Sequence, residues 1–260
     1  MSLPDRIYPS RPEQVYLVGT CLVDSFYPDA GMDAIHLLQS CGVQVIFPQD
    51  QSCCGQPAWN SGYEDEARAV ARTQLEAFAA DIPVVVMMGS CAGMMHLEYP
   101  RVFAGQPEEK RALALAARTY EFSEFMVNVL NYQPMKDGKT SSQPLRVALH
   151  TSCSARRGMQ VAAEHKALVE SLPGVQVVEP ARVTECCGFG GTFSVKQGDI
   201  SAAMAADKAD AMAATGADCI VSADCGCLMN IGGTLEKQGR PMATKHLATL
   251  LWESAQESGK

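Results

Sequence analysis

The sequence contains no apolar run that approaches the roughly 20 residues required by a transmembrane helix. Residues 1–6 also lack the apolar region of a secretory signal. Basic residues are few: 21 Lys and Arg against 29 Asp and Glu give a net charge of −8. No basic block reaches five residues, which excludes the composition typical of nucleic-acid-binding proteins. We therefore expect a cytoplasmic protein with no transmembrane segment and no nucleic acid partner, whose association with a membrane would be peripheral and through a partner.

The common cofactor motifs are absent as well. The sequence has neither GxGxxG nor GxxxxGK[ST], and it carries no flavin signature. It also lacks the CxxCxxCxxxC run of bacterial ferredoxins. Dinucleotide binding, a phosphate loop and a ferredoxin-type cluster are therefore excluded as explanations of this chain.

Cysteine, by contrast, is abundant and regularly placed. The chain has eleven cysteines in 260 residues, an odd number that cannot all form disulfides. Two vicinal pairs, Cys53-Cys54-Gly55 and Cys186-Cys187-Gly188, begin 133 residues apart. In the first half, 31 residues separate Cys21 from Cys53 and 36 separate Cys54 from Cys91. In the second half, the corresponding gaps are 32 residues after Cys153 and 37 before Cys225, so the sequence is interpreted as a tandem duplication.

Each half alternates apolar strands with helical patterns. Predicted strands cover 14–19, 43–47 and 83–88 in the first half, and 145–149, 175–178 and 219–222 in the second. Predicted helices cover 29–40, 63–80, 162–172 and 199–215. The pattern predicts an α/β fold of two tandem-duplicated lobes, each a mostly parallel sheet flanked by helices, related by a pseudo-two-fold axis. The lobes are expected at 1–133 and 145–260, joined by a polar linker at 134–144.

Every cysteine of the repeated pattern follows an apolar strand. Ligands of open α/β sheets bind at the carboxyl ends of the strands, so the thiols of one lobe are expected at one sheet edge. Thiolates select zinc, copper(I) or iron–sulfur clusters, whereas structural zinc sites usually use pairs separated by two to four residues. Adjacent cysteines suit a cluster with several irons better than one tetrahedral ion, because the planar peptide makes their side chains diverge. Iron–sulfur binding is the preferred interpretation, with zinc binding and vicinal disulfide chemistry as the alternatives.

The repeated layout, Cys…Cys-Cys-Gly…Cys, resembles the cysteine-rich CCG domain family. The segments that carry the resemblance are 19–21, 53–57, 89–94, 186–193 and 225–230. This family includes a component of heterodisulfide reductase and the iron–sulfur subunits of complexes that oxidise glycolate or L-lactate. The resemblance to the L-lactate group implies an oxidoreductase component that transfers electrons during oxidation of L-lactate to pyruvate. It further implies companion oxidoreductase subunits as partners, one of them a ferredoxin-type iron–sulfur protein.

The sequence thus predicts one or two iron–sulfur clusters, of the 4Fe–4S type. The expected ligands of the first lobe are Cys21, Cys53, Cys54 and Cys91. Those of the second lobe are Cys153, Cys186, Cys187, Cys225 and Cys227. The family pattern ends each lobe with CxxC, whereas here Cys91 has no such partner and Cys225 is followed by Cys227 after one residue.

This departure leaves other functions open. A fused, noncubane cluster of the heterodisulfide reductase type would require five thiols in each lobe, so a cluster is expected first in the second lobe. A catalytic subunit of that type, a subunit that acts on glycolate or another 2-hydroxy acid, and a zinc-stabilised scaffold without activity are the alternative functions.

Several other residues lie close to the motifs. Cys41 and Cys219 are expected to be buried small apolar residues. His150 and His246 are interpreted as structural, hydrogen-bonded histidines, with a role as ligand or proton donor as the alternative. Arg156, Arg157 and Lys196 are expected either on the solvated surface or near a cluster, where they would offset its charge or bind a substrate carboxylate.

Overall fold

The computed structural model of the chain describes residues 6–134 and 143–258. Residues 135–142, which make up most of the expected linker, lie outside the described residues. Within the described residues, no helix has both the length and the hydrophobicity needed to cross a bilayer.

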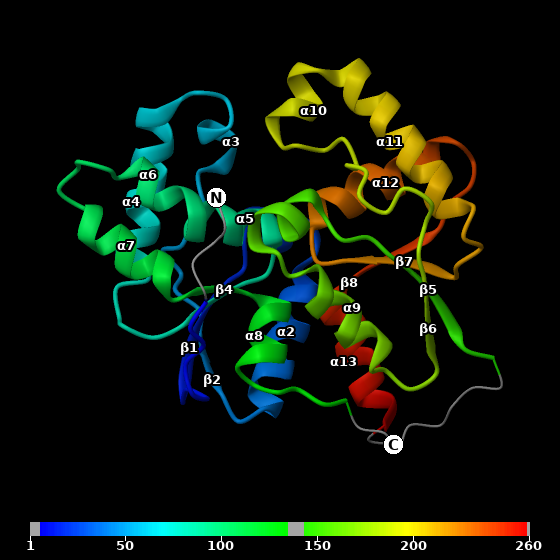
Figure 1. Cartoon of the computed structure of the whole chain (residues 1–260), viewed down its shortest axis with the longest axis horizontal. Coiled ribbons are helices and arrows are strands. Elements are labelled where there is room, and N and C mark those ends of the chain that lie inside the picture. Colours follow the sequence, from blue (N-terminus) through cyan, green and yellow to red (C-terminus); the bar gives the residue numbers. More distant parts are fainter. Residues whose placement is uncertain (1–5, 135–142, 259–260) are drawn as a thin grey trace.

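Two four-stranded parallel sheets form the framework (Figure 1). The first has the order β2-β1-β3-β4 and consists of β1 (Gln14–Val18), β2 (Gln44–Ile46), β3 (Val84–Val86) and β4 (Thr119–Glu121). The second has the order β6-β5-β7-β8 and consists of β5 (Leu145–Leu149), β6 (Val175–Val178), β7 (Cys219–Ser222) and β8 (Ala243–His246). Both sheets therefore place their strands in the same order along the chain, which confirms the duplicated α/β fold.

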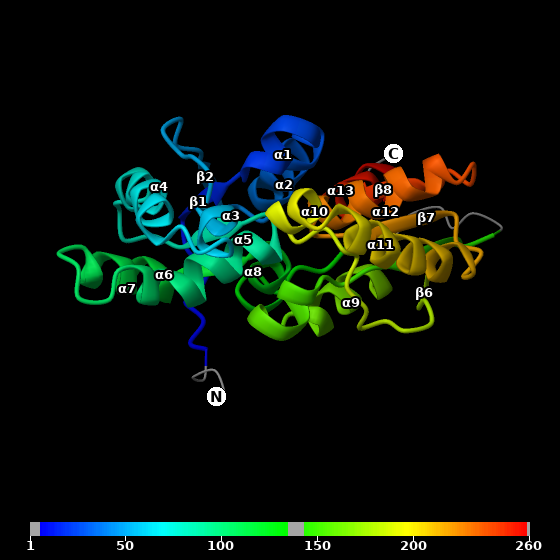
Figure 2. The ribbon, with the colours of Figure 1, turned by 90° about the horizontal axis from the view of Figure 1, so that it is seen from above.

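Helices connect the strands and cover both faces of each sheet (Figures 1 and 2). Those of the first lobe are α1 (Cys21–Phe26), α2 (Pro28–Ser40), α3 (Gln56–Trp59), α4 (Glu64–Ala77), α5 (Gly89–Gly93), the π-helix η1 (Met94–Glu98), α6 (Tyr99–Val102), α7 (Glu109–Ala117) and α8 (Phe122–Asn128). Those of the second lobe are the π-helix η2 (Ser154–Met159), α9 (Ala162–Glu170), α10 (Thr192–Lys196), α11 (Gly198–Ala213), α12 (Cys225–Lys237) and α13 (Leu247–Ser258).

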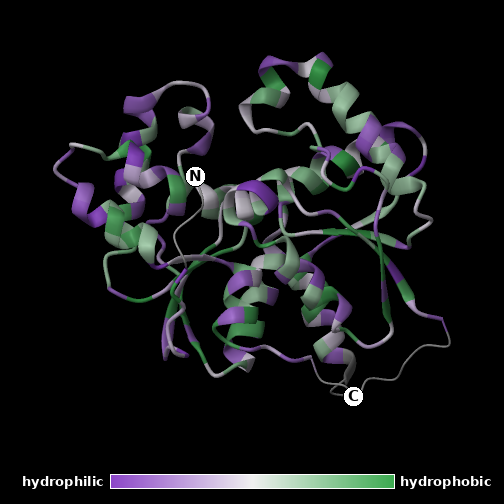
Figure 3. Ribbon diagram, viewed as in Figure 1, coloured by the Kyte–Doolittle hydropathy of each residue, from purple (hydrophilic) through white to green (hydrophobic). Residues whose placement is uncertain are grey.

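The central strands are buried on both faces. All three residues of β3 and all four of β7 are buried, as the continuous apolar runs predict for a covered parallel sheet. The hydropathy colouring shows the same pattern, with hydrophobic strands and two-faced helices (Figure 3). The six predicted strands and four predicted helices are present with ends shifted by up to three residues.

The two lobes share one hydrophobic core. Helix α2 of the first lobe packs against α13 of the second, and α8 of the first lobe packs against α9 of the second. Because α2 and α9 follow the first strand of each sheet, and α8 and α13 follow the last, these two contacts are equivalent. Buried residues from both lobes join in a single contiguous cluster at this interface. The lobes are therefore fixed relative to each other, with their strand ends facing a common space.

Candidate metal centre

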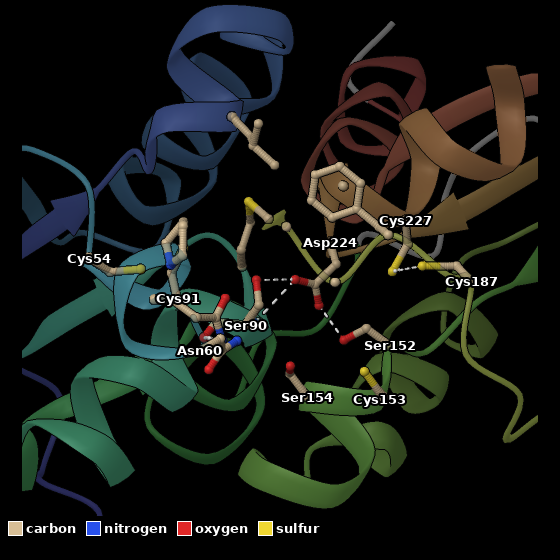
Figure 4. Close-up of a pocket in the computed structure, with 18 of the residues that line it drawn as sticks. Cys54, Asn60, Ser90, Cys91, Ser152, Cys153, Ser154, Cys187, Asp224 and Cys227 are labelled. Atoms are coloured by element: carbon tan, nitrogen blue, oxygen red, sulfur yellow. Dashed lines mark hydrogen bonds between the residues drawn. The ribbon is translucent and has the colours of Figure 1, made fainter. Parts of the chain in front are cut away.

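Thiols from both lobes line one cavity. The cavity has a volume of 230 Å³ and lies between the carboxyl ends of the two sheets. Eight of the nine expected ligands contribute to its wall: Cys21, Cys53, Cys54, Cys91, Cys153, Cys186, Cys187 and Cys227. The ninth, Cys225, does not line it and is completely buried. The sequence predicted two separate groups of thiols, and the structure places these groups on opposite sides of the same cavity (Figure 4).

In the first lobe, four thiols form a connected chain. The Cys21 side chain hydrogen-bonds to that of Cys53, and Cys53 hydrogen-bonds to Cys54. Cys54 hydrogen-bonds in turn to Cys91. Cys21 begins α1 after β1, the vicinal pair follows β2, and Cys91 lies in α5 after β3. Three loops that are distant in sequence thus bring the four sulfurs together at one sheet edge, as the topology predicts.

The second lobe repeats this chain. The side chain of Cys153 hydrogen-bonds to Cys186, and Cys186 hydrogen-bonds to Cys187. The sulfurs of Cys187 and Cys227 lie 3.0 Å apart. The backbone N–H of Gly188 donates to the sulfur of Cys186 at 3.4 Å, and Gly55 donates in the same way to Cys53. Each lobe therefore presents a matching set of four thiols. All eleven cysteines are free thiols.

The sheet register shows that Cys227, rather than Cys225, corresponds to Cys91. Val86 lies opposite Glu121 in the first sheet, and Ser222 lies opposite His246 in the second. Glu121 accepts the backbone N–H of Ser123 at 2.7 Å and His246 accepts that of Ala248 at 3.1 Å, so these two residues are equivalent.

Cys91 lies five residues after Val86, and Cys227 lies five residues after Ser222. Cys225 then corresponds to Gly89, because each lies three residues after the same strand position. The spacing in the sequence paired Cys91 with Cys225, and this correspondence was wrong. Insertions between the strands are not visible in a count of intervening residues.

Crowding controls the ionisation of these thiols. Hydrogen bonds from Cys21 and Cys54 hold the pKa of Cys53 far below its ordinary value, and those from Cys153 and Cys187 do the same for Cys186. Conversely, donation to Cys53, followed by burial, raises the pKa of Cys54. In each vicinal pair, the pKa of the first thiol is therefore lowered and that of the second is raised. Four thiolates at such spacing need a multiply charged cation among them, and the soft donor set fits an iron–sulfur cluster or zinc.

The glycines after the vicinal pairs allow the backbone to turn tightly against a helix. Gly55 and Gly188 have positive φ angles of 86° and 81°. A Cβ atom at Gly188 would lie 2.6 Å from the carbonyl oxygen of Ser201, and one at Gly55 would lie 3.1 Å from that of Ala67. Glycine is therefore required for both conformation and space.

We expect Gly188→Ala to destabilise the protein more than Gly62→Ala. Gly62 also has a positive φ, 81°, but a Cβ atom there would have no neighbour within 4 Å, so it reports the conformational cost alone, about 1–2 kcal/mol. The carbonyl contact at Gly188 adds about 1–3 kcal/mol. Urea unfolding of the metal-free variants measures the difference. Equal midpoints would show that the close approach to Ser201 carries no cost.

A buried aspartate connects the two lobes at the cavity wall (Figure 4). One Asp224 carboxylate oxygen accepts the backbone N–H of Ser90 at 3.1 Å and its hydroxyl at 2.7 Å. The other oxygen accepts the hydroxyl of Ser152. Ser90 and Ser152 directly precede Cys91 and Cys153, so Asp224 fixes one thiol loop from each lobe. Sequence analysis missed this residue; its position directly before Cys225, after an apolar strand, was the available signal.

The two histidines differ. His246 is buried and lies 3.1 Å from the carbonyl oxygens of Met87 and Ala223, which confirms its structural role. His150 is also buried, but neither ring nitrogen has a hydrogen-bond partner among the described residues, so the structural interpretation was wrong there. Instead, a nitrogen of His150 lies within 4.8 Å of the sulfurs of Cys187 and Cys227. His150 directly follows β5, which brings the ring close to these thiols.

The remaining residues lie away from the cavity wall. Cys219 is buried in β7 as expected, whereas Cys41 is only partly buried after α2. The Arg157 guanidinium donates to the carbonyl of Thr184 on the surface, and Lys196 lies over the ring of Tyr63 from the other lobe at 5.0 Å. Arg156, Arg157 and Lys196 do not line the cavity, nor does any other Arg, Lys or His of the described residues. Within this part of the chain, the cavity therefore offers no cation to bind a substrate carboxylate.

Comparison with known proteins agrees with this geometry. The family described as the cysteine-rich domain, CCG, matches residues 15–96 and 147–232. Lactate utilization protein A of Geobacillus thermodenitrificans is 43% identical over 239 residues, which cover 92% of this chain and 98% of that protein. Lactate utilization protein A 1 of Bacillus mycoides is 40% identical over 248 residues, which cover 95% of this chain and 99% of that protein.

A crystal structure of a hypothetical protein from Helicobacter pylori shares the fold, with a TM-score of 0.61 at 10% identity. It is matched over 98% of this chain, which spans about half, 52%, of that structure. The repeated motif, its matching thiol sets and the similarity along most of the sequence lead to one assignment. The chain belongs to the cysteine-rich CCG domain family, in the group of its members named lactate utilization protein A.

Proposed function

We propose that the protein is an iron–sulfur electron-transfer subunit, with one [4Fe–4S] cluster held by each lobe. The ligands are Cys21, Cys53, Cys54 and Cys91 in the first lobe, and Cys153, Cys186, Cys187 and Cys227 in the second. The observation that supports this proposal is the pair of matching four-thiol chains on one cavity. The lobes that hold the clusters extend over 1–133 and 145–260, with a linker at 134–144.

The chain's own residues prepare each site for a charged cluster. The N–H groups of Gly55 and Gly188 already donate to cysteine sulfurs, and such bonds stabilise thiolates. Tyr99 donates to the carbonyl of Cys54 at 3.0 Å, and Asn230 donates to that of Cys187 at 2.7 Å, which fixes both vicinal pairs. When bound, the clusters supply one-electron chemistry.

The proposed overall reaction is the oxidation of L-lactate to pyruvate by a multi-subunit oxidoreductase in the cytoplasm. The names of the relatives support lactate as the substrate. Among the described residues, the cavity has no basic side chain for the lactate carboxylate, so substrate binding is assigned to a companion subunit. This chain would pass electrons between that subunit and another, of which one carries ferredoxin-type clusters.

A zinc-stabilised scaffold is the second candidate, and a specific observation favours it. His150, Cys187 and Cys227 offer three ligand atoms within 4.8 Å of one another, which suits a single zinc ion. In the first lobe, Val18 occupies the position in the sheet that corresponds to His150. Zinc at one histidine-containing site therefore explains only half of the repeated pattern.

Metal analysis of protein purified without oxygen tests the proposal. We expect about eight irons and eight sulfides per chain, the content of two [4Fe–4S] clusters, with an EPR signal after reduction. Zinc without sulfide, in protein that takes up no cluster on reconstitution, would leave only the scaffold. Lactate-dependent reduction of the clusters is expected only when the companion subunits are added. Disulfide reduction by the isolated protein would instead support a heterodisulfide-reductase-like function.

A further inference from the structure

At two buried positions beside the thiols, the second lobe has a basic side chain and the first lobe does not. Thr20 accepts the N–H of Val23 and Ser152 accepts that of Ala155, so these residues are equivalent. Two residues earlier, Val18 in the first lobe therefore corresponds to His150 in the second. Similarly, Gly55 approaches the carbonyl of Ala67 as Gly188 approaches that of Ser201.

Seven residues beyond those carbonyls, Gln74 in the first lobe corresponds to Lys208 in the second. A valine and a neutral amide in one lobe are thus replaced by an imidazole and an amine in the other.

His150 is a buried polar group without a partner among the described residues. It is 1% exposed, and neither ring nitrogen forms a hydrogen bond in this part of the chain. An unpaired buried donor is destabilising, and this cost is removed when an acceptor is present. The sulfurs of Cys187 and Cys227 lie within 4.8 Å, and they become strong acceptors when a cluster holds them as thiolates. Val18 can offer no such donor to the first lobe.

Lys208 places a cation near His150 and the second-lobe thiols. Its side chain is completely buried, and its ammonium donates to the carbonyls of Arg182 at 3.1 Å and Val183 at 3.3 Å. It also interacts electrostatically with Cys187 and Cys227. Gln74 is equally buried in the first lobe, where it donates to the carbonyl of Ser52 at 2.6 Å. Both side chains therefore hold the segment before the vicinal pair, but only Lys208 adds positive charge.

Asp224 adds an acidic group where the two lobes meet. Its carboxylate accepts hydrogen bonds from the residue before Cys91 and from the residue before Cys153. Its negative charge acts on Cys153 and Cys227 of the second lobe, and so opposes part of the effect of Lys208. Two buried groups that the first lobe lacks, His150 and Lys208, act in the opposite direction.

We propose that the second-lobe cluster has the higher reduction potential, so that electrons pass from the first lobe to the second. This inference rests on the proposed function. Hydrogen bonds to the sulfurs and positive charge nearby favour the reduced cluster, which is more negative by one charge. In each transfer, the first-lobe cluster loses one electron and the second-lobe cluster gains it.

Redox titration of single-cluster variants tests the order. The double variant Cys53→Ser/Cys54→Ser retains the second cluster, and Cys186→Ser/Cys187→Ser retains the first, each confirmed by its iron content. We expect the potential of the former to be the higher of the two, as measured by EPR-monitored titration. An equal or reversed order would overturn the inference. Wild-type protein without iron and sulfide would instead overturn the proposed function itself.

The causes are tested by giving the second lobe the residues of the first. In the Cys53→Ser/Cys54→Ser background, His150→Val and Lys208→Gln should each lower the potential of the remaining cluster. Lys166→Gln is the matched control, because this lysine is exposed and pairs with Glu179 on the surface. An equal shift of the potential in Lys166→Gln would contradict the roles of His150 and Lys208. So would an unchanged potential in both His150→Val and Lys208→Gln. If one variant fails to retain iron, the other and the order of the two clusters still decide.

Discussion

Replacement of Cys187 by serine is expected to release about half of the bound iron, the share of one of two clusters. Cys187 is 2% exposed, and its thiol hydrogen-bonds to that of Cys227 at 3.0 Å. Among the described residues, no other thiol could take its place as a ligand. Cys54→Ser should release the other half, because Cys54 occupies the equivalent position in the first lobe. Iron and sulfide analysis of the purified variants measures both losses.

Cys219→Ser is the control for this experiment. Cys219 is also 2% exposed and lies in the same lobe, but its position in β7 is remote from the cavity wall. It should keep the full iron content. If Cys219→Ser and Cys187→Ser retain equal amounts of iron, the ligand assignment is wrong.

Cys225→Ser separates a four-thiol site from a five-thiol site. Cys225 corresponds to Gly89 and does not reach the cavity, so iron and the EPR signal should be unchanged. A changed cluster in this variant would support the noncubane cluster of the heterodisulfide reductase type, which requires a fifth thiolate.

Glu121→Ala is expected to cost about 3–5 kcal/mol of unfolding free energy, the range for removal of one partner from a buried ion pair. Glu121 has no exposed surface and lies 3.3 Å from the equally buried ring of His165, in the other lobe. It also caps α8 by accepting the N–H groups of Ser123 and Glu124. Urea unfolding measures the loss. Glu179→Ala, which breaks an exposed ion pair with Lys166, should change stability little.

The same ion pair predicts a dependence of stability on pH. Burial alone would lower the pKa of His165, but the adjacent charge of Glu121 outweighs burial and raises it above the ordinary 6.5. The stabilisation is therefore complete below pH 6.5, and it is lost as the pH rises through the raised pKa of the folded state. The difference in stability between the wild type and Glu121→Ala should shrink above that pH. A constant difference from about pH 6 to about pH 9 would contradict the ion pair.

Sequence alone was sufficient for the framework because its signals are local. Val84, Val85 and Val86 form a continuous apolar run, and such runs predicted the central strands of both sheets. The outer strands β4 and β8 were not predicted, because Thr119-Tyr120-Glu121 and Ala243-Thr244-Lys245-His246 lack an apolar run. The π-helices η1 and η2 also have no distinct pattern in the sequence.

The site was predictable only as a set of residue types. The vicinal pairs identified the chemistry, and the strand ends identified the sheet edge. The sequence could not show that α2 packs on α13 and α8 on α9, and this packing turns the two thiol sets toward one cavity. The same limit applies to Asp224, whose partners Ser90 and Ser152 come from different lobes. It also applies to His150, which resembles any histidine after a strand until its surroundings in the fold are seen.

The reciprocal packing of α2 on α13 and of α9 on α8 has the form of the isologous interface of a C2 homodimer. A single lobe of that kind would have formed its cavity only by self-association, with two identical walls. Joining two copies in one polypeptide fixes their stoichiometry and removes the requirement that both walls carry the same residues. The fused chain can then acquire a direction, which a symmetric dimer cannot have. The pairs Val18/His150 and Gln74/Lys208 are two of the places where its halves differ.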